Sequence, residues 1–201
     1  MSDPDRARSA RAGFRTNLTP DRANGPKRPL AETDGELVHF SVVLSLGSNL
    51  GDRLGHLRAA VAALRATPGL TVTAISGVYE TTPVGYVEQP DFLNIVVLGE
   101  SELAPDELLA RTQAIEAALG RVRTIRPRTI DIDLVAVDEI VADADRLTLP
   151  HPRAHGRAFV LVPWLEIDPD AELVGHGRVA DLVARTDVAG VRRITDWDGP
   201  T

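Results

Sequence analysis

Residues 120–133 read Gly-Arg-Val-Arg-Thr-Ile-Arg-Pro-Arg-Thr-Ile-Asp-Ile-Asp and place four arginines beside two carboxylates. The last five residues alternate between polar and apolar side chains, a pattern typical of a half-buried strand. Ile130 and Ile132 are then expected on one face of this strand, and Asp131 and Asp133 on the other. Residues two apart on a strand are separated by roughly 6.5 Å. Two carboxylates at that spacing can converge on one or two divalent cations.

The arginines of this segment supply the other half of a polyphosphate site, because guanidinium forks match phosphate oxygens and stay charged. The alternative is a solvated outer face, on which the acids only discourage pairing with another strand. Pro127 and the apolar alternation hold the acids at a fixed distance from the cationic residues. This joint arrangement favours a site for a metal-bound polyphosphate.

The composition of the chain limits what it can be. Its 201 residues are 43% hydrophobic and can bury one substantial core. We expect a disordered N-terminal tail over residues 1–36, where polar residues dominate, and a single domain over residues 37–201. The formal charge of −7 argues against a nucleic-acid partner. The chain has no cysteine, so a bound metal would be a hard cation on oxygen ligands, with Mg²⁺ the natural candidate.

No apolar run reaches the length that a membrane-spanning helix needs. The sequence therefore predicts a cytoplasmic protein without a membrane partner, and we expect a monomer.

Apolar periodicity predicts the remaining elements. The expected strands are residues 38–46, 70–79, 91–98 and the acidic strand from residue 129. Helical stripes run over residues 54–64, 108–119 and 157–166, and a last small element around residues 179–184 precedes a polar end. The turn over residues 47–52 can cap the first helix, or its Gly47 and Ser48 can approach a phosphate.

The order β-α-β-β-α-β predicts an α+β fold of the ferredoxin-like split β-α-β type. In this arrangement an antiparallel sheet is covered by helices on one face, here with C-terminal additions.

Phe92 and Asn94 share a strand face beside a long loop over residues 80–90. An aromatic plane next to an amide can hold a flat heterocycle, although a core phenylalanine and an edge asparagine would leave the same pattern. Gln113 and Glu116 lie one helical turn apart and off the buried stripe, where they either reach a nucleotide or are solvated.

His151 and His155 lie near a turn, where a lone histidine is more often structural than catalytic. No second ligand is spaced for zinc. Trp164 and Trp197 are most simply packing residues.

Several motifs in a fixed order resemble the 6-hydroxymethyl-7,8-dihydropterin pyrophosphokinases, ATP-dependent enzymes of the folate pathway. The resemblance covers residues 41–168. The motifs that carry it are residues 46–52, 79–85, 89–94, 112–116, 120–123, 127–133, 149–153 and 157–159.

The resemblance implies that ATP gives its terminal pyrophosphoryl group to the hydroxymethyl oxygen of the pterin and leaves as AMP. ATP and hydroxymethyldihydropterin are the implied partners, and two Mg²⁺ ions on Asp131 and Asp133 are the implied cofactor. The resemblance assigns catalysis to these two aspartates together with Arg121 and Arg128. The residues implied at ATP are Gln113, Glu116, Arg121, Arg123, Arg128, His151 and Arg157. Those implied at the pterin are Thr81, Thr82, Val84, Phe92, Asn94 and Phe159, with Phe92 and Phe159 on the two sides of the ring.

The chain departs from the family pattern at one place. Members usually carry a Trp-Gly pair between an arginine and Pro-Arg, whereas Arg126 runs directly into Pro127 here. In the family this loop folds over the substrates, so the shortened loop predicts weaker closure.

Two other classes of protein fit parts of the pattern. A palm-like nucleotidyltransferase also holds two metals on an Asp-x-Asp strand, but it releases pyrophosphate and needs a basic groove for a template. A ferredoxin-like module that binds RNA without catalysis would need exposed aromatic residues on its sheet. The acidic balance and the aromatic content of 4% disfavour both.

Overall fold

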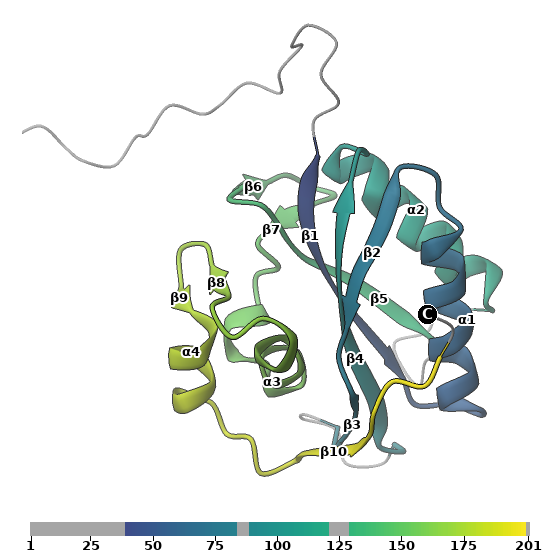
Figure 1. Ribbon diagram of the computed structural model, residues 1–201, viewed down its shortest axis with the longest axis vertical. Helices are drawn as coiled ribbons and strands as arrows, with labels where there is room; N and C mark the ends of the chain where they lie inside the picture. The colour runs from purple at the N-terminus through teal and green to yellow at the C-terminus, as the bar shows by residue number, and fades with distance from the viewer. Residues whose placement is uncertain (1–38, 84–88, 121–128, 200–201) are drawn as a thin grey trace, which may run out of the picture. The chain divides into compact units, whose positions relative to one another are not determined.

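Strand β1 (Phe40–Ser48) is the centre of the main sheet and is buried from Val42 onward. The computed structural model describes residues 39–83, 89–120 and 129–199. Within these ranges β1 pairs antiparallel with β4 (Phe92–Ser101) on one side and with β5 (Asp131–Val137) on the other (Figure 1). The strand expected over residues 38–46 therefore extends to Ser48, and Gly47 lies in the sheet instead of the following turn.

Helices α1 (Arg53–Arg65) and α2 (Pro105–Ala118) cover one face of this sheet (Figure 1). Their apolar side chains pack against alternate residues of β1, β4 and β5. The carboxylate of Asp52 caps α1, because it accepts a 2.9 Å hydrogen bond from the backbone N–H of Gly55. Both helices were predicted from their stripes, and both are confirmed.

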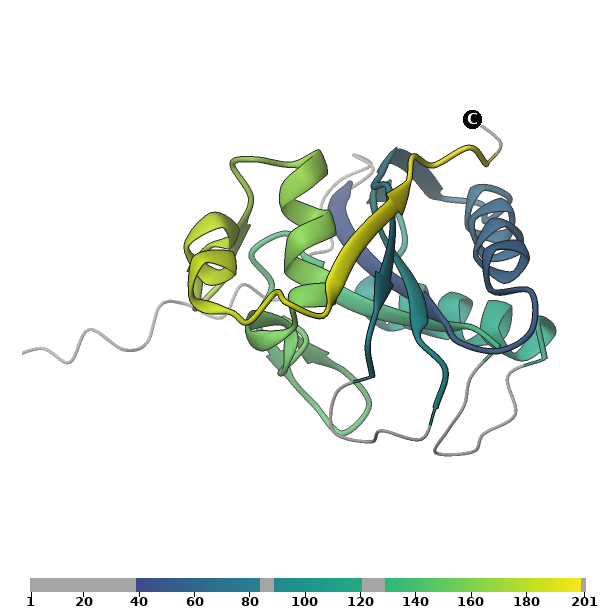
Figure 2. The same cartoon turned by 90° about the horizontal axis from the view of Figure 1, so that it is seen from below.

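Helices α3 (Ala158–Ile167) and α4 (Val179–Arg185) lie on the opposite face of the sheet, as Figures 1 and 2 both show. They pack against a second cluster that includes Val43 of β1 and Val96 of β4. The expectation that helices cover only one face is therefore wrong. The central strands have apolar residues in unbroken runs, which is the pattern of strands buried on both sides.

The strand predicted over residues 70–79 is two strands, β2 (Leu70–Ile75) and β3 (Val78–Thr81). Both pair with β4, so they share one position in the sheet. At the break between them, the backbone N–H of Gly77 donates to the carboxylate of Glu166 on α3 at 2.9 Å. This partner comes from a distant part of the chain, and no local pattern indicates it.

Strand β10 (Val191–Thr195) was not predicted, since only a polar end was expected after residue 184. It pairs antiparallel with β3 and completes the order β10-β3-β4-β1-β5. Its residues are mostly exposed, so it lacks the apolar signal of a core strand. The remaining small elements are β6 (Ala142–Asp143), β7 (Thr148–Leu149), the 3₁₀ helix η1 (Ala154–Gly156), β8 (Glu172–Leu173) and β9 (Gly177–Arg178).

The predicted α+β class is confirmed: the described ranges hold an antiparallel main sheet and four α-helices. Trp164 is buried on α3, and Trp197 packs against the α1 and α2 side of the core, as expected of packing residues. No helix in the described residues has the length and apolar character to cross a membrane. The tail predicted over residues 1–36 lies outside the described residues.

Candidate active site

Helix α3 leaves part of its face of the sheet uncovered, and this part forms the floor of a cavity of about 930 Å³. The floor runs from Asp131 and Asp133 on β5 at one edge of the sheet to Thr81 on β3 and Val191 on β10 at the other. The walls come from η1, the first turn of α3 and the segment before β10. The volume is at the upper end of the range for small-molecule pockets.

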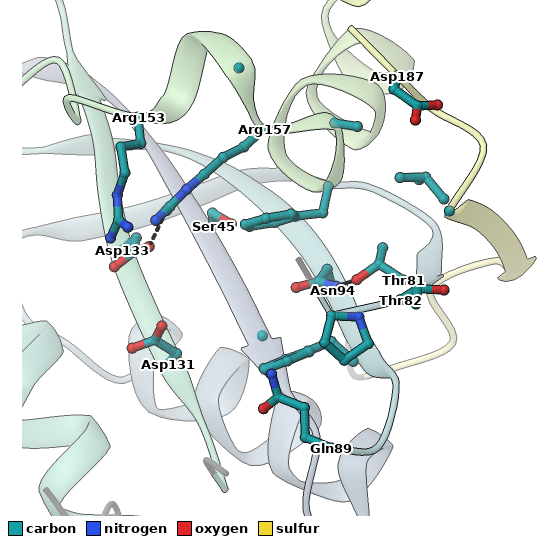
Figure 3. A pocket seen from close by; sticks show the side chains of 18 of the residues that line it. Ser45, Thr81, Thr82, Gln89, Asn94, Asp131, Asp133, Arg153, Arg157 and Asp187 are labelled. Atoms are coloured by element: carbon teal, nitrogen blue, oxygen red, sulfur yellow. Dashed lines mark hydrogen bonds and ion pairs between the residues drawn. The ribbon is translucent and has the colours of Figure 1, made fainter. Parts of the chain in front are cut away.

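The two aspartates of β5 point into this cavity (Figure 3). Ile130 and Ile132 face the core under α1 and α2 instead, so the predicted division of the two faces is confirmed. Asp133 lies opposite Ser45 in the register of β1 and β5, and Asp131 lies opposite Gly47. The acids therefore stand in two successive rows of the sheet, beside small residues that leave the space above them open.

Asp133 is the centre of a charged cluster on this side of the cavity. Its Oδ2 atom is 3.0 Å from Nη1 of Arg157 and 3.8 Å from Nε2 of His151. Arg153 lines the same cavity. The cluster joins β5 to the segment that leads into α3.

His151 is held mainly as a neutral ring. Burial lowers its pKa below the usual value of 6.5; the carboxylate of Asp133 opposes this, and the charges of Arg157 and Arg153 add to it. Nδ1 of His151 accepts a 3.1 Å hydrogen bond from the backbone N–H of Arg153. Nε2, on the other side of the ring, lies 3.3 Å from Nη1 of Arg157, so a donor approaches each of the two ring nitrogens.

The other side of the cavity is an aromatic and amide corner. Asn94 is 4% exposed, and its Nδ2 donates a 2.7 Å hydrogen bond to Oγ1 of Thr81. A Cβ atom on Gly47 would lie 2.8 Å from Oδ1 of Asn94, so the glycine leaves the room that this amide needs. Phe92 and Phe159 line the same cavity from β4 and α3, and the guanidinium of Arg157 lies 5.4 Å from the ring centroid of Phe159.

Most of the predicted site residues that the structure describes meet in this cavity. The ones that line it are Thr81, Thr82, Phe92, Asn94, Asp131, Asp133, Arg157 and Phe159. Val84, Arg121, Arg123 and Arg128, with the shortened loop before Pro127, lie outside the described residues.

Two predicted residues of α2 do not line the cavity. Gln113 is exposed. Glu116 is only 2% exposed, and its Oε1 accepts a 2.8 Å hydrogen bond from the backbone N–H of Ile132. Solvation, one of its two sequence-based interpretations, is therefore wrong for Glu116. The strand β5 pairs with β1 on one side, and this carboxylate satisfies a backbone donor on its other side.

Several cavity residues were not predicted as part of the site. Arg153 and His155 come from the turn before α3, and the ring of His155 stacks on His176 with centroids 4.3 Å apart. Their closeness in sequence to Arg157 was an available signal. The others are Ser45, Pro83, Gln89, Gly156, Ala158, Asp187, Gly190 and Val191. The last three come with β10, which no apolar pattern marked.

The α+β fold and this cavity, with carboxylates and arginines on one side and an aromatic amide corner on the other, define an enzyme that transfers a phosphoryl-type group. The family model of the 7,8-dihydro-6-hydroxymethylpterin-pyrophosphokinases matches residues 43–169. The chain belongs to this family. It transfers pyrophosphate from ATP to hydroxymethyldihydropterin, a step of folate biosynthesis.

Relatives from several bacteria are similar to the chain. It is 46% identical over 153 residues to the 2-amino-4-hydroxy-6-hydroxymethyldihydropteridine pyrophosphokinase of Methylorubrum extorquens, covering 75% of this chain and 96% of the relative. The Bacillus subtilis enzyme of the same name is 44% identical over 151 residues, or 74% of this chain and 87% of the relative.

A solved structure of wild-type Plasmodium falciparum HPPK-DHPS with pterin and p-hydroxybenzoate has a similar fold, with a TM-score of 0.60 at 16% identity. The match covers 76% of this chain and 44% of that one, so the chain spans less than half of the solved protein.

Proposed function

We propose that the cavity binds the two substrates side by side, with the phosphates of ATP over β5 and the pterin over β3 and β4. One observation carries this proposal: Asn94, Gly47 and Asp131 lie in a single row of the sheet, on adjacent strands. Two interstrand steps separate the backbones of Asn94 and Asp131 by roughly 9.5 Å. A ring held at Asn94 would therefore present its hydroxymethyl group toward phosphates held at Asp131.

The chemistry of the donor set fits magnesium. Asp131 and Asp133 offer hard oxygen ligands on one face, and the side chain of Asp133 is 32% exposed, which leaves it accessible to a cation. The described residues hold no group of three or more ligating side chains. Mg²⁺ requires none, because it is commonly held by one or two carboxylates and by substrate phosphates. Two ions held there would neutralise charge on the phosphate oxygens.

Arg157 and His151 are proposed as phosphate ligands beside the metals. The guanidinium of Arg157 already reaches Asp133, and its fork can contact phosphate oxygens next to that carboxylate. Nε2 of His151 lies 3.8 Å from Oδ2 of Asp133 and faces the same space. We extend the proposed roles at ATP to Gln113, Glu116, Arg121, Arg123 and Arg128 from the family resemblance alone.

We propose that the pterin is recognised by the shape of the aromatic and amide corner and by one fixed amide, that of Asn94. Because Nδ2 of Asn94 donates to Thr81, the Oδ1 atom remains to accept from an N–H of the ring. Phe92 and Phe159 supply aromatic faces for stacking. Val84, together with Thr82, completes the proposed pterin site by resemblance.

With both substrates bound, the protein acts chiefly by positioning and by neutralising charge. Holding the hydroxymethyl oxygen near the β-phosphorus of ATP turns a bimolecular step into an intramolecular one. Fixed cationic groups then stabilise the charge that develops on the bridging oxygen of the leaving AMP.

We also infer the finer fold and the assembly state. The order β1-α1-β2/β3-β4-α2-β5, with sheet order β3-β4-β1-β5, supports the ferredoxin-like split β-α-β arrangement. For the assembly state, we propose that the working unit is a monomer.

Product analysis with site variants tests these roles. Incubation with Mg²⁺, ATP and 6-hydroxymethyl-7,8-dihydropterin should give AMP and the pterin pyrophosphate in equal amounts. The variants Asp131→Asn and Asp133→Asn should each lower kcat by about a hundredfold or more, since they remove ligands of the charge-neutralising cations. Calorimetry should show weaker binding of Mg²⁺ and ATP to both. Variants that keep the parent's affinity and rate would refute the proposed metal site.

A further inference from the structure

One carboxylate outside the cavity links three elements that build it. Glu166 lies in the last turn of α3, and its Oε2 accepts hydrogen bonds from the backbone N–H of Gly77 at 2.9 Å and from the hydroxyl of Tyr79 at 3.1 Å. Its Oε1 accepts from Nε of Arg193 on β10 at 3.0 Å. A single side chain therefore ties α3 to both β3 and β10.

Each of these elements carries a wall of the cavity. Helix α3 begins with Ala158 and Phe159, strand β3 ends at Thr81, and the segment before β10 contributes Gly190. The backbone N–H of Thr82 donates to the carbonyl of Gly190 at 3.1 Å, which joins the two strands at the rim. Glu166 is not among the described residues that line the cavity.

Polar contacts, rather than apolar burial, hold β10 in place. Four of its five residues are exposed, so packing alone contributes little to its position. Arg192 pairs with Glu80 of β3, and Arg193 pairs with both Glu166 and Asp196. Of these acids, Glu166 is the one that also belongs to α3.

The local sequence is adapted to this link. A Cβ atom on Gly77 would lie 2.7 Å from Nε of Arg193, so the glycine allows the guanidinium to reach the carboxylate. Burial and the neighbouring charge of Glu166 raise the pKa of Tyr79 to about 12, which keeps its hydroxyl a donor at all physiological pH values. Three donors thus converge on an acceptor whose side chain is 26% exposed.

We propose that Glu166 is a positioning residue for the pterin: by holding α3 against β3 and β10, it sets the spacing between Phe159 and the Thr81–Thr82 edge. The charged side of the cavity around Asp133 is built from β5 and from the turn before α3, and Glu166 contacts neither of them. Loss of Glu166 should therefore weaken pterin use and spare ATP use. This inference rests on the pterin placement proposed above.

Steady-state kinetics with each substrate varied in turn tests the inference. Glu166→Ala should raise the KM for hydroxymethyldihydropterin about tenfold, the effect expected for losing a charge-assisted hydrogen bond. The KM of Glu166→Ala for ATP should change by less than about twofold. The pterin KM of Glu166→Gln should lie between those of the parent and of Glu166→Ala. The amide oxygen of this variant still accepts from Gly77 and Tyr79, but the side chain no longer forms an ion pair with Arg193.

Two further variants keep the test decisive. Arg193→Gln breaks the same link from β10, so it should reproduce the selective rise even if Glu166→Ala fails to fold. Glu107→Ala removes an exposed ion pair with Arg111 on α2, on the other face of the sheet, and should change neither KM.

Equal increases in both KM values, or a loss of thermal stability in Glu166→Gln and Arg193→Gln without any change in the pterin KM, would overturn the inference. Asn94→Ala separates it from the proposed site. If Asn94→Ala raises the pterin KM and the Glu166 and Arg193 variants do not, only the positioning role fails. An unchanged KM in Asn94→Ala would overturn the pterin placement and the positioning role together.

Discussion

Asp133 and Arg157 form a 3.0 Å ion pair across the phosphate side of the cavity. The carboxylate is a proposed metal ligand and the guanidinium a proposed phosphate ligand, so each serves as the other's counter-ion before substrates bind. This pairing keeps both side chains in place at modest electrostatic cost, because opposite charges this close stabilise each other in a partly buried site.

Arg157→Lys should lower kcat/KM for ATP by about tenfold or more. A lysine keeps the charge but loses the planar fork that can contact Asp133 and a phosphate together. Steady-state kinetics with ATP varied would measure this. Arg111→Lys, on the exposed side of α2, is the matched control and should leave kcat/KM unchanged. Equal rates for Arg157→Lys and the parent would show that the fork is not used.

Gly47→Ala should raise the KM for the pterin about tenfold. The added Cβ would lie 2.8 Å from Oδ1 of Asn94, and the amide would have to move. Glu107→Ala provides the comparison, since this residue forms an exposed ion pair on α2, on the other face of the sheet, and its variant should leave the pterin KM unchanged. A Gly47→Ala enzyme with the parent's pterin KM would mean that Asn94 does not read the ring.

Glu116→Ala should lower the free energy of unfolding by about 1–3 kcal/mol, because it leaves the buried backbone N–H of Ile132 without this acceptor. Gln113→Ala, one turn earlier and exposed, should change it by less than about 0.5 kcal/mol. Urea titration followed by circular dichroism measures both values. Similar stabilities for the two variants would contradict a structural role for Glu116.

Stability should fall in alkaline solution through Tyr79. Its pKa is raised from 10.0 to about 12 in the folded protein, chiefly by burial and then by Glu166. Below pH 10 the phenol is protonated in both states. Between pH 10 and about 12 the unfolded chain loses this proton while the folded chain keeps it, so the free energy of unfolding decreases as pH rises.

Tyr79→Phe should flatten this part of the stability curve. Urea titrations of the parent and the variant at pH 9, 10, 11 and 12 (roughly the span of the shift) give the comparison. The difference between the two proteins should shrink as pH rises, and a constant difference would show that Tyr79 does not titrate with folding.

The acidic strand could be predicted because it needs only local information. Alternation over residues 129–133 places Asp131 and Asp133 on one face wherever the strand lies, and the same argument paired Phe92 with Asn94. The long apolar run of β1 also indicated a central strand. In the alternating segments the two-residue period is sufficient to assign each side chain to a face, since tertiary contacts only decide what covers that face.

The pterin edge of the cavity could not be predicted in the same way. Gly77 at the break and Arg193 on β10 both contact Glu166, which lies 89 positions after Gly77 in the chain. Likewise, the second face of the sheet is covered because α3 folds back across it, which is a tertiary contact. The burial of Glu116 was not predicted because its partner is a backbone N–H on another element, and apolar periodicity does not indicate such a contact.

The pairing of Val191 with Thr81 sets the order in which the cavity can be completed. During synthesis the chain emerges from its N-terminus, and β3 leaves the ribosome long before β10. The sheet from β3 to β5 can assemble first, with its carboxylates already facing the open floor. The rim around Thr81 has to wait for the final strand, so the nascent enzyme acquires its proposed phosphate wall before its proposed pterin wall.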